Sequence, residues 1–277
     1  MTIKVDGSPY GVMTASDGTM WFSMAQEGRV GRVSGGGEVE VFQLDPADGQ
    51  PTVLAEASDG AVWVTEFAGG RLSRITREGR VSSVELASPY GMAHGPDGAL
   101  WVTQVQADRV ARIGPDGTVT SVEMPGMPSA ITAGADGALW VTLNQGNAIG
   151  RVTTAGEVTV FPLPTEGAMP VGLTAGPDGA VWFVEIGAGQ VGRITPDGGI
   201  VEYPLPDRSA RPHAIITGPD GALWFTEWGA GRLGRITLEG EITEFELDGA
   251  EPHGLAVGAD GRIWVAMESG TLTSFTP

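Results

Sequence analysis

The chain repeats one unit seven times, and this repeat limits the fold more than any other feature. Each copy starts at a proline, runs through a short apolar stretch to an Asp-Gly turn and then reaches a tryptophan, as in "RPHAIITGPDGALWFTE". The leading prolines are Pro9, Pro51, Pro89, Pro128, Pro170, Pro212 and Pro252, and the tryptophans are Trp21, Trp63, Trp101, Trp140, Trp182, Trp224 and Trp264. A period of about 40 residues is the length of a four-stranded propeller blade.

Each unit contains four strand patterns. One strand follows the proline, and the Asp-Gly turn, which favours tight reversals, leads to a second strand that carries the tryptophan. A third strand lies around segments such as "GRLGRIT", and a fourth is exemplified by "ITEFEL". No stretch has helical periodicity. The sequence therefore predicts an all-β fold, a seven-bladed β-propeller with four antiparallel strands per blade, as a single domain over residues 1–277.

The last unit is one strand short. After its tryptophan strand only "TLTSFTP" remains, whereas "TIKV" at residues 2–5 lies outside the first unit. We predict that this N-terminal strand completes the last blade and closes the ring.

Charge and composition narrow the possible partners. The chain has 34 acidic and 16 basic residues, a net charge of −18, which repels phosphate backbones and anionic lipid surfaces. No run approaches the roughly 18 apolar residues of a membrane span, and the N-terminus does not resemble a signal peptide. We expect a cytoplasmic protein that binds neither nucleic acid nor membrane. The absence of cysteine excludes thiol nucleophiles and cysteine metal sites.

Residues that recur in every copy are best explained by packing, so functional residues are sought where copies differ. Connections from the fourth strand to the next first strand, and from the second strand to the third, open on one face. The residue after each leading proline lies at the start of the innermost strand on that face. These residues are Tyr10, Thr52, Tyr90, Ser129, Val171, His213 and His253. Two of the chain's three histidines therefore occupy equivalent positions in neighbouring blades.

Carboxylates also distinguish the last blade. Glutamate recurs three residues past the tryptophan at Glu66, Glu185 and Glu227, which indicates a structural repeat feature. Glu268 instead lies four residues past Trp264, and together with Glu251 it gives the last blade two carboxylates on the face of His253. Two carboxylates without thiols suit a hard divalent cation, for which we expect Mg²⁺, and an imidazole is a natural base near neutral pH. The alternative is that the glutamates pair with arginines such as Arg211 and the histidines only line the channel.

One tryptophan, Trp228, lies outside the seven repeat positions. It falls in the connection after the second strand of the sixth unit, on the histidine face, where an aromatic side chain suits a bulky apolar ligand. Tyr10, Tyr90, Met24 and Met267 extend the same wall in this interpretation. Ordinary loop packing is the alternative for each of them.

The segments "ARPHAI", "LWFTEWGAGRLGRIT", "AEPHG" and "IWVAME", in that order, resemble the virginiamycin B lyase family, also called streptogramin lyases. The resemblance covers essentially the whole chain. It implies a monomeric, seven-bladed, Mg²⁺-dependent enzyme that opens cyclic type B streptogramins, which are small depsipeptides, at their ester bond by elimination. In such an enzyme His253 is the general base, Glu251 and Glu268 hold Mg²⁺, and His213 contacts the substrate. Tyr10 and Trp228 are expected to line the substrate site.

Two other functions stay open at this point. One is a related lyase that acts on a different lactone or ester, and the other is a propeller that binds a ligand without converting it. A Ca²⁺-dependent lactonase-type propeller is less favoured. Such a site recruits Asn and Asp around the channel, and the only asparagines of this chain are Asn144 and Asn147. The second unit, "QPTVLAEASDG", also lacks the Tyr-Gly of the "PYG" copies, which affects the expected substrate rim.

Overall fold

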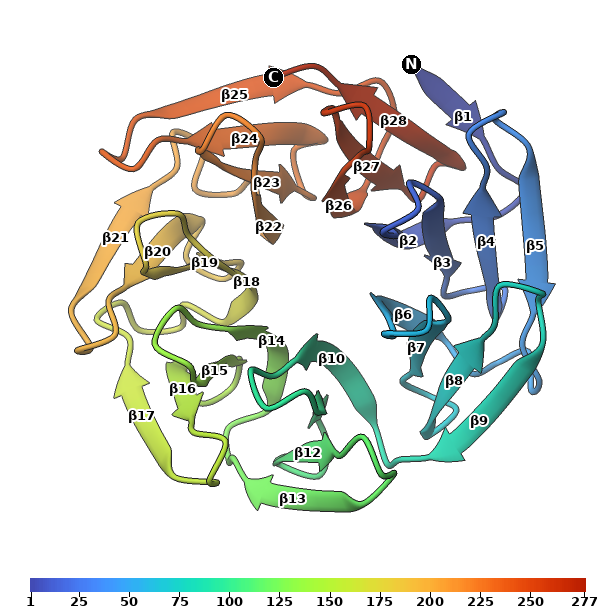
Figure 1. Ribbon diagram of the computed structural model, residues 1–277. Coiled ribbons are helices and arrows are strands. Elements are labelled where there is room, and N and C mark those ends of the chain that lie inside the picture. The colour runs from blue at the N-terminus through green and yellow to red at the C-terminus, as the bar shows by residue number, and fades with distance from the viewer. The chain divides into compact units, whose positions relative to one another are not determined.

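The computed structural model describes residues 1–277, and β-strands are its only regular secondary structure. Its 28 strands form seven four-stranded antiparallel sheets, so the protein is an all-β, seven-bladed β-propeller, as the repeat predicts (Figure 1). The strands are β1 (Thr2–Lys4), β2 (Pro9–Thr14), β3 (Met20–Met24), β4 (Arg29–Val33), β5 (Val39–Gln43), β6 (Pro51–Glu56), β7 (Val62–Glu66), β8 (Arg71–Ile75), β9 (Val81–Glu85), β10 (Pro89–His94), β11 (Leu100–Gln104), β12 (Arg109–Ile113), β13 (Val119–Glu123), β14 (Pro128–Ala133), β15 (Leu139–Leu143), β16 (Ala148–Val152), β17 (Val158–Pro162), β18 (Pro170–Ala175), β19 (Val181–Glu185), β20 (Gln190–Ile194), β21 (Ile200–Pro204), β22 (Pro212–Thr217), β23 (Leu223–Glu227), β24 (Arg232–Ile236), β25 (Ile242–Glu246), β26 (Pro252–Val257), β27 (Ile263–Met267) and β28 (Thr271–Phe275).

The chain divides into two compact units. The first comprises residues 1–90, 218–220 and 247–277, and the second comprises residues 91–217 and 221–246. The assignment of all 277 residues to a single domain stays a prediction. The structure contains no helix of the length and apolarity that a membrane crossing requires.

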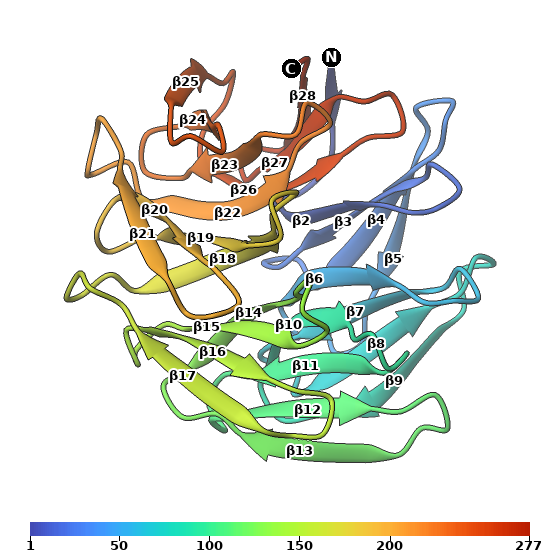
Figure 2. The ribbon, with the colours of Figure 1, turned by 60° about the vertical axis from the view of Figure 1, so that its left-hand side comes forward.

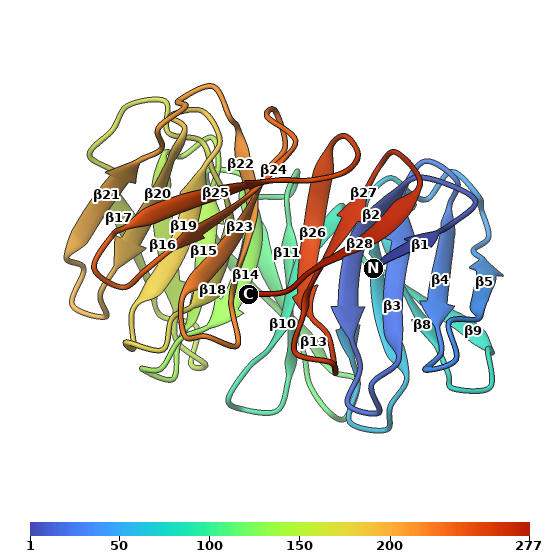
Figure 3. The same cartoon turned by 90° about the horizontal axis from the view of Figure 1, so that it is seen from above.

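The last sheet of the first unit joins the two ends of the chain. Its strand order is β1-β28-β27-β26, and β1 pairs antiparallel with β28 through Thr2↔Thr273 and Lys4↔Thr271. Figure 3 shows β1 in blue beside β28 in red. The N-terminal strand therefore completes the last blade, as predicted. The other six sheets keep their strands in sequence order, as β18 to β21 do in Figure 2.

The aspartate of the Asp-Gly turn accepts hydrogen bonds from the tryptophan of the second strand and from an arginine of the third strand. In the sheet β18 to β21, Trp182 Nε1 donates to Asp178 Oδ1 at 3.2 Å, and Arg193 Nε donates to Asp178 Oδ2 at 2.7 Å. Asp97 and Asp136 bond Arg112 and Arg151 in the same way. Each turn is thus tied to the second and third strands of its own blade. These arginines are therefore structural residues that hold the strands of one blade together.

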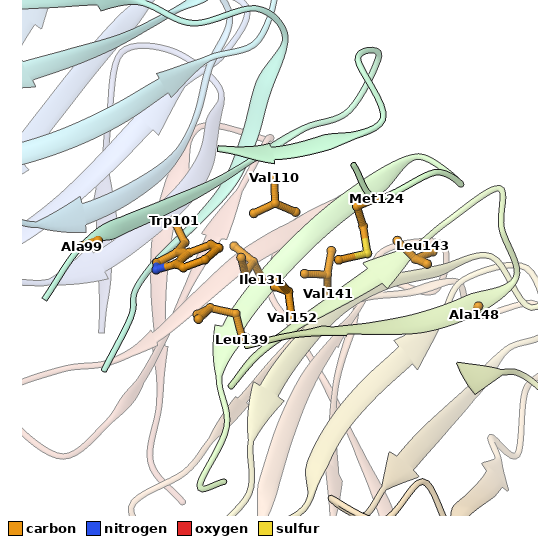
Figure 4. Close-up of a cluster of buried hydrophobic side chains, with 10 residues drawn as sticks. All are labelled: Ala99, Trp101, Val110, Met124, Ile131, Leu139, Val141, Leu143, Ala148 and Val152. Carbon is orange, nitrogen blue, oxygen red and sulfur yellow. The ribbon is translucent and has the colours of Figure 1, made fainter. Parts of the chain in front are cut away.

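The core lies between neighbouring sheets within each unit. In the second unit, the side chains of Ala99, Trp101 and Val110 meet Ile131 and other residues of the following sheet, as Figure 4 shows. Trp182 likewise packs with Phe225 and other residues of the next sheet. Burial of such large rings contributes most of the interaction between blades. The repeat tryptophans are therefore packing residues, as predicted.

Candidate active site

The backbone that carries Glu251 and His253 has the same local shape in most copies. Residues just before a leading proline adopt left-handed φ angles at Gln50, Ser88, Met127, Met169, Arg211 and Glu251. Between Pro252 and Leu255 the register of β26 against β27 then shifts by one residue, and β2, β6, β14, β18 and β22 shift at the equivalent position. A β-bulge of this kind turns a side chain out of the normal alternation. The repeat thus fixes the backbone positions of Glu251 and His253. Their chemistry comes from their side chains, at which this copy differs from most of the others.

Glu251 and Glu268 lie side by side. The Glu268 backbone N–H donates to the Glu251 carbonyl at 3.2 Å, beside the cross-strand pair Pro252↔Met267. The pKa of the Glu268 carboxyl is raised to about 7, mostly by burial, then by the hydrogen bond and charge of Glu251, with a smaller effect of Glu27. The raised pKa reflects, in part, repulsion between the two negative carboxylates. A bound cation would relieve this repulsion.

His253 lies between this acidic pair and an aromatic ring. Its Nε2 is 3.2 Å from Glu268 Oε1, and the residue is only 8% exposed. The Tyr10 ring lies 4.5 Å from the imidazole, centroid to centroid, at an interplanar angle of 32°. Close approach of β26 to β2 depends on Gly254, because a Cβ there would lie 2.8 Å from the Tyr10 carbonyl oxygen. The imidazole is therefore held on two sides.

Tyr10 is itself fixed by a second tyrosine. The two phenol oxygens of Tyr10 and Tyr90 are 2.7 Å apart, and Thr65 Oγ1 donates to the Tyr90 carbonyl at 2.8 Å. Burial raises the pKa of Tyr10, and Tyr90 and Glu268 raise it further. Burial also raises the pKa of Tyr90. Both phenols stay protonated near neutral pH and can donate hydrogen bonds. The sequence indicated Tyr90 only as part of an aromatic wall, and its hydroxyl contact was not anticipated.

Glu27 is a neighbour that sequence reasoning missed. It lies in the connection between β3 and β4, where its Oε1 accepts a hydrogen bond from the Ser8 N–H at 3.0 Å. Its charge is among the causes that raise the pKa of Glu268. Its place in a connection that opens on the histidine face is the signal that could have identified it.

His213 and Trp228 belong to the second unit. His213 is the second residue of β22, and burial lowers its pKa to about 4, so it is a neutral imidazole at neutral pH. Trp228 follows β23, and its backbone N–H donates to the Arg211 carbonyl at 3.1 Å. The Arg211 guanidinium lies 5.6 Å from the Trp228 ring centroid. Of the six predicted site residues, the structure brings Tyr10, Glu251, His253 and Glu268 together in the first unit.

The Glu251–Glu268 pair fits a hard divalent cation better than a soft one. No group of three or more His, Cys, Asp or Glu side chains is arranged as a metal site. A cation that takes one or two protein carboxylates and completes its shell with water or substrate matches the behaviour of Mg²⁺. An imidazole beside such a pair can accept a proton from a bound molecule.

The chain is thus a seven-bladed β-propeller with a candidate acid–base site built on its first unit. The sequence profile of the Virginiamycin B lyase family matches residues 1–275, so the chain belongs to that family.

Solved structures agree with this assignment. The selenomethionine form of virginiamycin B lyase from Staphylococcus aureus is 39% identical, with a TM-score of 0.95 over 100% of this chain and 98% of that one. A catalytically inactive variant of the S. aureus enzyme with quinupristin is 38% identical, with the same TM-score over 100% of this chain and 98% of that one. A curated virginiamycin B lyase from Nocardia farcinica (strain IFM 10152) is 54% identical over 45 residues, and this match spans 16% of each chain.

Proposed function

We propose that this protein is a Mg²⁺-dependent carbon–oxygen lyase that linearises cyclic type B streptogramins by elimination at the lactone ester. Family membership and the similar S. aureus structures support the reaction class. The observation that carries the assignment of residues is the position of His253 Nε2, 3.2 Å from Glu268 Oε1 beside the paired Glu251. Tyr10, His213 and Trp228 complete the proposal as substrate contacts.

In the proposed reaction His253 accepts the α-proton of the threonine-derived residue. The electron pair of that C–H bond forms the Cα–Cβ double bond, the Cβ–O bond breaks and the carboxylate leaves. The product is a linear peptide with a dehydro-amino acid and the mass of the substrate. Tyr10 fixes the imidazole by ring contact, and Glu268 lies against Nε2 of the same ring. Mg²⁺, when bound by Glu251 and Glu268, would supply positive charge for the oxygen on which negative charge develops.

Mass spectrometry of the product tests the reaction. Quinupristin, the compound found with the inactive S. aureus relative, is incubated with the protein and Mg²⁺, with and without a chelator. The proposal predicts a linear product of unchanged mass that does not form with the chelator. A product heavier by one water would indicate hydrolysis, and tight binding without conversion would favour a propeller that only binds.

Matched variants test the residue roles. His253→Ala is expected to lower kcat by about 10²–10⁴, the usual contribution of a general base, whereas His94→Ala, at an exposed histidine of β10, keeps full activity. Equal activity of both variants would refute the role of His253.

Metal binding is tested without turnover. Mn²⁺ serves as a paramagnetic probe of the carboxylate pair. Glu251→Gln and Glu268→Gln are expected to weaken Mn²⁺ binding about 10-fold or more, since each removes one of two charged ligands. Glu246→Gln, at an exposed residue of β25, is expected to leave it unchanged. Unchanged Mn²⁺ affinity in both ligand variants would refute the metal assignment.

A further inference from the structure

A cluster of carboxylates surrounds one arginine in the sixth sheet. Glu227, the last residue of β23, is 0% exposed and lies opposite Arg232, the first residue of β24. Arg232 Nε donates to Glu227 Oε2 at 3.0 Å, and its NH1 lies 3.5 Å from Glu244 Oε2 on β25. Arg232 therefore links three strands of one sheet.

The same guanidinium reaches the connection that precedes β22, the first strand of its own sheet. Arg232 NH2 donates to Asp207 Oδ2 at 3.1 Å, and Asp207 lies between β21 and β22. The other oxygen, Asp207 Oδ1, accepts hydrogen bonds from the Ser209 N–H at 2.9 Å and the Ser209 hydroxyl at 2.6 Å. The Asp207 carbonyl accepts the Ala210 N–H at 3.1 Å. The turn of this exposed connection is thus organised around one carboxylate, which Arg232 holds.

Of the two segments that Arg232 joins, one leads into His213 on β22 and the other carries Trp228. Trp228 N–H donates to the Arg211 carbonyl and Gly229 N–H donates to the Ala210 carbonyl, so the connections are bonded directly to each other. Arg211 has a φ of 52° and places its guanidinium over the Trp228 ring. On the other connection, the Glu227 carbonyl accepts the N–H groups of Ala230 and Gly231. Displacement of either segment would therefore change the position of Trp228 relative to β22.

The second sheet offers an internal comparison. Arg71 lies opposite Glu66 in the same register as Arg232 opposite Glu227, and it donates to both Glu66 oxygens at 2.9 and 2.8 Å. Its contact with the preceding connection is a 3.5 Å approach to the Pro46 carbonyl, and Asp45 and Asp48 of that connection act on it only at longer range, through their charge, without forming an ion pair. The glutamate–arginine pair is thus a repeat feature, whereas the ion pair with the connection distinguishes Arg232 from Arg71.

We propose that Arg232 is a positioning residue for substrate binding: through Asp207 and Glu227 it fixes the connection that leads into His213 on β22 and the connection that carries Trp228. This inference rests on the proposed function for its substrate. The net free energy that a charge-assisted hydrogen bond of this kind contributes corresponds to roughly a ten-fold change in an equilibrium constant. Because His253 and the acidic pair belong to the other unit, loss of the link is expected to raise KM for quinupristin about ten-fold and to change kcat less than about three-fold.

Three variants separate positioning from folding. Arg232→Gln removes the whole link, and Arg232→Lys restores part of it as the conservative change. Asp207→Asn breaks only the ion pair and leaves the buried pair with Glu227 intact, so it folds even where Arg232→Gln does not. Arg71→Gln is the matched control in the second sheet, and it is expected to leave KM unchanged.

Fluorine NMR of 5-fluorotryptophan-labelled protein supplies a readout that needs no substrate. Trp228→Phe and Trp63→Phe assign the two signals. The Trp228 signal is expected to shift or broaden in Asp207→Asn, with the Trp63 signal unchanged, and Arg232→Lys is expected to lie nearer wild type than Arg232→Gln. An unchanged Trp228 signal in Asp207→Asn would overturn the positioning role, as would a rise in KM in Arg71→Gln equal to that in Asp207→Asn. Absence of turnover by the wild type would overturn the proposed function, while the NMR result would still decide the positioning role.

Discussion

Replacement of Glu185 by glutamine is expected to stabilise the protein at alkaline pH. Glu185 is 0% exposed at the end of β19. Its Oε2 accepts a hydrogen bond from Gln190 Nε2 at 2.6 Å, and its Oε1 is buried without a hydrogen-bond partner. Gln190 occupies the register position that Arg71 and Arg232 occupy opposite Glu66 and Glu227. This glutamate therefore lacks the arginine partner that the other two have.

The pKa of Glu185 sets the size of the effect. The pKa is raised from 4.5 to about 8: burial is the largest cause, the Gln190 hydrogen bond lowers it, and the charge of Glu202 raises it. The folded protein therefore keeps a proton on Glu185 that the unfolded chain loses above pH 4.5. The stability contributed by this proton is fully present below pH 4.5 and is lost as the pH rises to about 8. At about 1.4 kcal/mol per pH unit, the loss between pH 5.5 and 8 is about 3 kcal/mol.

Urea unfolding at pH 5.5, 7 and 8.5 checks this. Glu185→Gln does not titrate, so the difference between its free energy of unfolding and that of wild type is expected to grow by about 3 kcal/mol from pH 5.5 to pH 8.5, in favour of the variant. Glu66→Gln is the control: it leaves Arg71 without its buried carboxylate and is expected to cost about 3–5 kcal/mol at every pH tested. A difference between Glu185→Gln and wild type that does not increase with pH would refute the reasoning.

Three further changes test the fold. Trp182→Ala, at a side chain buried against the next sheet, is expected to lower the free energy of unfolding by about 3–5 kcal/mol in urea titrations, and a loss below about 1 kcal/mol would contradict the packing role. Asp178→Ala removes the acceptor of Arg193 and Trp182 Nε1 and is expected to cost about 1–3 kcal/mol, whereas Asp197→Ala, at an exposed turn, costs less than about 0.5 kcal/mol. Deletion of residues 1–4 removes the outer strand of the last sheet and should speed amide hydrogen exchange in β28 well beyond that in β24. Equal protection of β28 with and without the strand would refute its role.

The repeat made the fold predictable because one local pattern was available in seven copies. A proline, an Asp-Gly turn and alternating strands are ambiguous in one copy, but their recurrence fixes register and strand number. The first strand of each sheet starts at the predicted proline, for example at Pro89 and Pro212. The missing strand of the last copy was equally readable, because an incomplete repeat needs a partner from outside itself.

The site was predictable only where it follows from repeat position. Proximity of Glu251, His253 and Glu268 follows from their places on β26 and just after β27, and so does the place of Tyr10 on the neighbouring strand β2. The Tyr10–Tyr90 hydroxyl contact depends on side-chain conformations in two separate blades, which the sequence does not specify. The bulge that turns His253 out of strand alternation was equally beyond a pattern of alternating residues.

Protonation was the least predictable property. Glu66, Glu185 and Glu227 share a repeat position, and all three are buried as structural residues. The pKa of Glu185 nevertheless reaches about 8, mainly because the carboxyl is buried, and the charge of Glu202 adds to the rise, whereas the Gln190 hydrogen bond lowers it. Such a shift depends on burial and on neighbours from other strands, so it emerges only from three-dimensional structure.

Turnover of quinupristin in ¹⁸O-labelled water tests the central claim, elimination with His253 as the base. The account predicts a linear product that has the mass of the substrate and no label, and that His253→Ala does not form at a comparable rate. A product heavier by one labelled water, or equal rates for wild type and His253→Ala, would contradict it.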